Sequence, residues 1–150
     1  MKRITDISKP SDQQVVDLVN LDNSLSLVVS DLDIGIPKVN DNLQISTCNT
    51  VLKLAKKLGA YGVVDIYYDR IDMSEFNKIG TPNIKVSANP TLLDVLNAFN
   101  TFYSSNISIN EIDLSTTLAT PTINGNLMTV KISHKSLVYV GECVINLKLL

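Results

Sequence analysis

Residues 91–104 read Thr-Leu-Leu-Asp-Val-Leu-Asn-Ala-Phe-Asn-Thr-Phe-Tyr-Ser, the best helical pattern in the chain. Thr91 follows Pro90 and can cap the first turn, with Asp94 three residues later. Apolar side chains then recur at helical spacing and predict one wide face, formed by Leu92, Val95, Leu96, Phe99, Phe102 and Tyr103. Such a face must be covered, so the sequence predicts a helix packed against a sheet.

Strands are expected on both sides of this helix. Residues 61–70 read Tyr-Gly-Val-Val-Asp-Ile-Tyr-Tyr-Asp-Arg, dense in β-branched and aromatic side chains. Further extended segments are expected at 25–29, 84–86, 127–133 and 137–149, with a turn at 134–136 and a loop at 115–126. The sequence therefore predicts an α+β fold with a mostly antiparallel β-sheet and one main helix, at about 91–104.

A short N-terminal helix is expected at residues 11–20. Ser11 and Gln14 have the spacing of a capping box, and Val15, Val16 and Val19 share one side. A helical turn at 109–113 has the same kind of signal. Residues 1–10 are interpreted as a possible extended arm of a single domain that spans residues 1–150.

Residues 50–55 admit two interpretations. Their apolar stripe at helical spacing, closed by Gly59, indicates a helix over 49–59. An internal similarity favours a strand instead, because residues 51–58 parallel residues 130–137, and Ile66 then corresponds to Ile145. Both segments would be a strand, a basic turn and a second strand, so we expect a strand at 50–55.

Composition excludes several classes of protein. Hydrophobic residues make up 45% and charged residues 19% of the 150 residues, which excludes an intrinsically disordered chain. A formal net charge of −2 provides no basic surface for nucleic acid. No apolar run is long enough to span a membrane, and none follows the basic start as in a signal peptide. Cys48 and Cys143 are expected to be reduced and structural.

The residues offer little for catalysis or metal binding. His134 is the only histidine and lies in a lysine-flanked turn, where we expect a solvated side chain. Asp31 and Asp33 resemble the start of a calcium loop, but the glycine falls one position early and Asn42 stands where the last glutamate belongs. We therefore expect no enzyme activity, no catalytic residue, no metal, no cofactor and no small-molecule substrate.

Tyr67, Tyr68 and Arg70 are the candidate interface residues. Tyrosine and arginine are enriched at interface hot spots, and Tyr67 and Tyr68 face opposite sides of a strand. The alternative is a tyrosine packed over the core, with Arg70 paired to Asp69 or Asp72.

Three patches carry a resemblance to a known family. They are Leu18–Asn23 followed by Asp31-Leu32 and Gly35–Pro37; Tyr61–Asp72; and Thr91–Asp94 with Asn97, Ser108-Ile109, Ile112-Asp113, Ser136-Leu137, Tyr139 and Gly141. In their order the chain resembles small virion proteins of tailed bacteriophages with large genomes. It departs from that pattern at Tyr61-Gly62, where the family tends to place a residue between the two.

The resemblance implies a structural virion protein, made and assembled in the host cytoplasm. It would belong to a tail, baseplate, neck or fibre and act by protein–protein assembly, with other virion proteins or with copies of itself. Two alternatives are a capsid decoration protein and a receptor- or carbohydrate-binding module of a tail appendage. Neither nucleic acid nor a membrane is expected as a partner.

Overall fold

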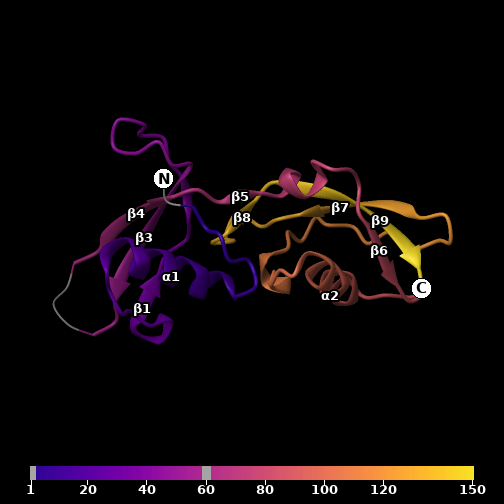
Figure 1. The fold of residues 1–150 in the computed structure, drawn as a ribbon, viewed down its shortest axis with the longest axis horizontal. Helices are drawn as coiled ribbons and strands as arrows, with labels where there is room; N and C mark the ends of the chain where they lie inside the picture. The colour runs from indigo at the N-terminus through magenta and orange to yellow at the C-terminus, as the bar shows by residue number, and fades with distance from the viewer. Residues whose placement is uncertain (1–2, 59–61) are drawn as a thin grey trace. The chain divides into compact units, whose positions relative to one another are not determined.

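The computed structural model describes residues 3–58 and 62–150, in which two α-helices accompany mostly antiparallel strands (Figure 1). The predicted α+β fold is confirmed. The chain divides into two compact units: unit 1 comprises residues 1–71 and 135–138, and unit 2 comprises residues 72–134 and 139–150. The expectation of a single domain over residues 1–150 stays a prediction.

In unit 1, a sheet is built around one central strand. The elements are α1 (Ser11–Asn23), the 3-10 turn η1 (Val29–Asp31), β1 (Leu32–Ile34), β2 (Lys38–Val39), β3 (Thr50–Lys56) and β4 (Val64–Tyr68). On one side of β3, β1 and β2 pair antiparallel with its two ends, and β4 pairs antiparallel on the other side. Arg3 forms a parallel bridge with Asp69, just past the end of β4.

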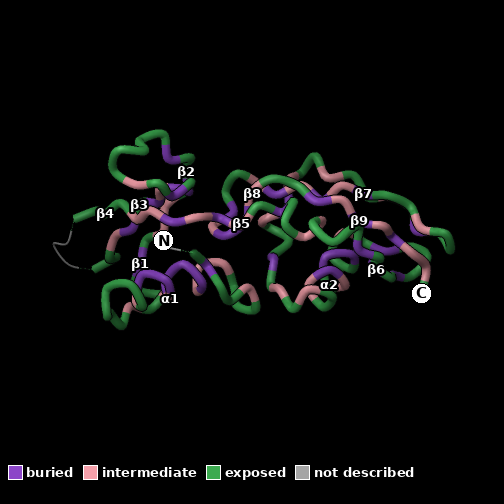
Figure 2. Tube along the Cα trace, turned by 45° about the horizontal axis from the view of Figure 1, so that its top comes forward, coloured by how far each residue is buried: buried purple, intermediate pink, exposed green. Residues whose placement is uncertain are grey.

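The core of unit 1 lies between α1 and this sheet. Val16 and Val19 on α1 pack with Leu32 on β1 and Leu54 on β3. Figure 2 shows buried positions along α1. The predicted apolar side of the helix is confirmed, whereas the predicted capping box is wrong. Pro10 holds the N-cap position, and the Gln14 amide donates to the Lys9 carbonyl at 2.6 Å.

Unit 2 also has a sheet with one central strand. Its elements are η2 (Met73–Asn77), β6 (Asn83–Val86), α2 (Leu92–Tyr103), η3 (Ile109–Glu111), β7 (Asn126–Lys131) and β9 (Glu142–Leu149). The central strand β9 pairs parallel with β6 and antiparallel with β7. Two short strands, β5 (Ile71–Asp72) and β8 (Tyr139–Val140), form a separate ladder.

The helix α2 confirms the main sequence prediction, including the Thr91–Asp94 capping box. Phe99 is buried and packs against Phe76, with ring centroids 5.4 Å apart. Phe102, expected on the same face, is 57% exposed instead. Tyr103 takes the inward position in the last turn, because its hydroxyl donates to the Phe76 carbonyl at 2.9 Å.

Several strand predictions are confirmed, and some need correction. Residues 50–55 are the strand β3, and 84–86 lie in β6. The expected strand at 137–149 is divided into β8 and β9 by Gly141, whose φ is 82°. The expected strand at 25–29 is irregular and ends in η1, because the Asn20 side chain binds the backbone of Leu27. Of 61–70, only 64–68 form β4, and residue 61 lies outside the described residues.

The two units repeat one arrangement of elements at a separation of 80 residues. Identical residues at this separation are Ile4 and Ile84, Pro10 and Pro90, Val15 and Val95, Asn20 and Asn100, Ser24 and Ser104, and Asp33 and Asp113. Each helix ends at its serine in the left-handed conformation. Each is followed by a 3-10 turn that begins 80 residues from its counterpart, at 29 and 109.

A side-chain clamp is repeated in the same way. The Asn20 amide donates to the Leu27 carbonyl at 2.9 Å and accepts from the Leu27 N–H at 2.8 Å. Asn100 makes the same pair of bonds with Ile107, both at 2.9 Å. An asparagine thus satisfies a backbone segment that has no strand neighbour, which explains why residues 25–28 need no β-ladder.

The sheets correspond as well. Leu54 pairs with Val64 in unit 1, and the equivalent pair in unit 2 is Val130 with Cys143. Equivalent residues are thus 76 positions apart in β3 and β7, and 79 positions apart in β4 and β9. Ile66 and Ile145 therefore occupy equivalent positions, as the sequence similarity indicates. The sequence similarity pairs residues 51–58 with residues 130–137, a separation of 79, whereas the structure places β3 and β7 at a separation of 76. For this first strand, the sequence alignment is therefore three residues out of register with the structure.

Candidate interface

Two of the three predicted interface residues are buried. Tyr68 is fully buried and Arg70 is 7% exposed. The Arg70 guanidinium donates to the Thr50 hydroxyl at 3.0 Å and to the Ser136 carbonyl at 3.2 Å. The Tyr68 hydroxyl donates to the Leu137 carbonyl at 2.6 Å. The prediction that Tyr68 and Arg70 face a partner is therefore corrected: both attach residues 135–138 to the sheet of unit 1.

Burial also shifts the protonation equilibria of this pair. It raises the pKa of Tyr68 well above its usual range and lowers the pKa of Arg70, because both charged forms lose solvation. Asn49 completes the cluster, since its amide donates to the Arg70 carbonyl at 3.2 Å and accepts from the Arg70 N–H at 3.0 Å. These contacts are structural, and they hold the end of β4 beside the start of β3.

Tyr67 is the predicted residue that remains available at the surface. Its half-buried side chain lines an open depression of about 530 Å³ together with residues 43–48. Leu43 is 69% exposed and Ile45 is 62% exposed in this loop. We call Leu43, Ile45 and Tyr67 the Tyr67 surface.

The loop that carries Leu43 and Ile45 is organised from within by Asn40. The buried Asn40 amide donates to the carbonyls of Ser46 and Cys48, at 2.8 and 2.9 Å, and its oxygen accepts from the Asn42 N–H at 3.1 Å. The interior of the loop is thus occupied by its own polar contacts. Leu43 and Ile45 remain directed to solvent, where apolar area has no compensating contact.

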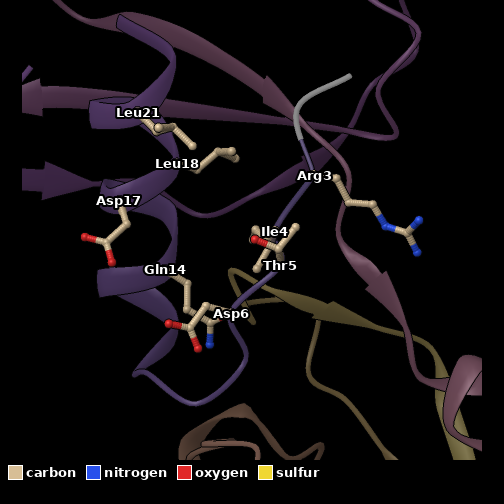
Figure 3. Close-up of a pocket in the computed structure, with 8 residues that line it drawn as sticks. All are labelled: Arg3, Ile4, Thr5, Asp6, Gln14, Asp17, Leu18 and Leu21. Carbon is tan, nitrogen blue, oxygen red and sulfur yellow. The ribbon is translucent and has the colours of Figure 1, made fainter. Parts of the chain in front are cut away.

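A second, smaller hollow is lined by the N-terminal segment and α1 (Figure 3). Its volume is about 90 Å³, below the range of about 300–1,000 Å³ that small-molecule sites occupy. Lys9 lies 2.6 Å from Asp17 and 3.7 Å from Asp6. Hydrogen bonds from Lys9 and Gln13 lower the pKa of Asp17, and bonds from Ser8 lower that of Asp6. These acidic groups already have donors within the chain.

The other candidate residues are not among those that line the depression beside Tyr67. Asp31 and Asp33 are exposed, and the described residues contain no group of three or more histidine, cysteine or acidic side chains that could hold a metal ion. His134 is exposed in its turn, as predicted. No helix in the described part of the chain is long and apolar enough to cross a membrane.

Both cysteines are free and buried, as the sequence predicts. Burial raises the pKa of the Cys143 thiol to about 12. A thiol with such a pKa is almost entirely protonated at neutral pH, so Cys143 acts as a small apolar side chain in β9.

Sequence reasoning missed Leu43, Ile45 and Asn40. These residues lie in a loop with neither helical nor strand periodicity, so no pattern assigned them to a face. The available signal was the presence of two large apolar residues among the polar residues 40–49. That signal does not indicate whether such residues are buried or exposed to solvent.

No curated protein matches the chain, and no solved structure matches it. One family model matches residues 4–149, nearly the whole chain and thus both copies of the repeated arrangement. The protein therefore belongs to the family described as a family of unknown function (DUF7941).

Proposed function

We propose that the protein is a structural component of a bacteriophage virion, in a tail, baseplate, neck or fibre, and that it acts by protein–protein assembly. The observation that carries this proposal is the Tyr67 surface. An ordered loop holds two large apolar side chains in water beside a tyrosine, in an arrangement that gains stability when a partner covers it.

The sequence resemblance to small virion proteins of tailed bacteriophages supports the same function. So does the low content of charged residues, 19% of the chain, because neutral polar groups lose less solvation than charges when a partner covers them. The partners are other virion proteins or further copies of this chain.

The test is the presence of the protein in purified phage particles. Quantitative mass spectrometry of the particles should detect it at a fixed copy number, and antibody labelling in electron microscopy should place it on the tail, baseplate, neck or fibre. Labelling spread over the capsid would identify a decoration protein instead. Absence from particles at every stage of assembly would contradict the proposal.

A further inference from the structure

Because the two units repeat one arrangement, corresponding strands can be compared. The strands β4 in unit 1 and β9 in unit 2 differ at the edge that faces away from β3 and β7, respectively. In unit 2 this edge of β9 is covered. The Asn77 amide donates to the Val144 carbonyl at 2.7 Å and accepts from the Val144 N–H at 2.9 Å. Beyond it, the Asn146 N–H donates to the Pro82 carbonyl at 2.9 Å, and β6 pairs with residues 146–149.

In the described part of the chain, the equivalent edge of β4 in unit 1 is open. The backbone N–H and C=O of Arg70 both pair with Asn49, on the side of β4 that faces β3. Along a strand, the backbone groups of successive residues point to opposite edges. The N–H and C=O groups of Asp65 and Tyr67 therefore point to the edge away from β3. These two residues correspond to Val144 and Asn146, 79 positions later. Arg3 reaches only Asp69, and within residues 3–58 and 62–150 nothing pairs with the outward backbone groups of Asp65 and Tyr67.

This edge also lacks the usual protection against pairing. β4 reads Val-Asp-Ile-Tyr-Tyr, without lysine, proline or glycine. Its one charge, Asp65, is offset by Lys53 of the same sheet at 2.9 Å. By contrast, the outer strand β6 carries Lys85.

The outer side of β7 is covered from within the chain at its C-terminal end. The Asp113 N–H donates to the Lys131 carbonyl at 2.9 Å, and the Ser133 N–H donates to the Glu111 carbonyl at 2.7 Å. Within the described residues, Asp65 and Tyr67 of β4 have no such cover.

We propose that β4 pairs antiparallel with β4 of a second copy of this chain, so that two sheets of unit 1 join across a two-fold axis. A two-fold contact brings the same donors and acceptors of both copies together, so each open N–H meets an open C=O. Because each Asp65 has its own Lys53, the two carboxylates do not repel strongly. The exposed Val63 and Val64 add apolar area at the contact. This inference rests on the proposed function and names a self-contact for it.

The test uses a matched pair of variants at one position. Both variants lose the ion pair between Asp65 and Lys53. Asp65→Pro also removes the outward backbone N–H but spares the hydrogen bonds to β3, whereas Asp65→Ser keeps that N–H. We expect sedimentation to show a dimer for wild type and Asp65→Ser, and a dissociation constant at least about tenfold higher for Asp65→Pro. Equal dimerisation of a folded Asp65→Pro variant would overturn the proposal, as would a wild-type chain that stays monomeric at high concentration.

A second measurement does not depend on the proline variant remaining folded. Amide hydrogen exchange of wild type should show protection of Asp65 and Tyr67 that increases with protein concentration. Protection that appears only after another virion protein is added would overturn self-pairing. These results are independent of whether the protein is found in phage particles, so failure of the proposed function and failure of this contact can be distinguished.

Discussion

Arg70 donates a hydrogen bond to the carbonyl of Ser136, a residue 66 positions later in the chain. This contact joins residues 135–138 to unit 1, although the residues on both sides of that segment belong to unit 2. The arginine therefore stabilises the fold.

We expect Arg70→Ala to lower the free energy of unfolding by roughly 2–4 kcal/mol, because it removes buried hydrogen bonds to the Thr50 hydroxyl and the Ser136 carbonyl. Urea denaturation followed by circular dichroism would measure the change. Lys53→Ala, which removes an exposed cation, should cost less than about 1 kcal/mol. Equal losses for the two variants would contradict the structural role of Arg70.

The interleaved units predict cooperative unfolding. Neither unit is continuous in sequence, so a fragment of residues 1–71 lacks the segment that Arg70 and Tyr68 bind. We expect this fragment to be unfolded, and the full chain to unfold in one transition with the same midpoint by tyrosine fluorescence and by circular dichroism. Two separate transitions would show that the chain has two folding domains instead of one.

Phe99 and Phe102 form a matched pair on one helix. Phe99→Ala should cost about 3–5 kcal/mol, because it opens a cavity between α2 and Phe76. Phe102→Ala should cost less than about 1 kcal/mol, since that side chain is exposed. Thermal unfolding of the two variants would check the difference, and similar losses would show that α2 does not pack as described.

The Tyr67 surface can be tested without loss of stability. The double variant Leu43→Ser and Ile45→Ser removes exposed apolar area, and Leu114→Ser does so at a fully exposed position of unit 2. We expect the double variant to fold normally but to enter phage particles at a tenth of the wild-type level or less. The Leu114 variant should enter normally. Equal incorporation of both variants would place the contact elsewhere.

The buried thiol of Cys143 should make the stability of the fold depend on pH in the alkaline range. Its pKa is raised from 9.0 to about 12 by burial, so the folded state keeps a proton that the unfolded chain loses. This contribution to stability is complete below about pH 9 and is lost as the pH rises toward 12. In the Cys143→Ala variant, the loss of stability between pH 8 and pH 10.5 should be smaller than in wild type.

The sequence predicted those elements whose signals are local. Thr91 and Asp94 marked the start of α2, and the similarity between residues 51–58 and 130–137 identified β3 as a strand against its helical stripe. It could not predict the burial of Arg70, because that depends on a carbonyl 66 residues away. Nor could it predict that Leu43 and Ile45 face solvent, since this follows from Asn40 filling the loop from inside.

The repeated arrangement creates a risk during folding, since each half could capture a strand or helix that belongs to the other. Exchange of this kind is a characteristic error of proteins with repeated units. The two copies differ in the size of some core side chains: Val19 occupies the place that Phe99 takes in the second copy, and Leu54 that of Val130. A helix in the wrong half would leave a void or overfill its site, so the divergence of the two copies itself selects the correct pairing.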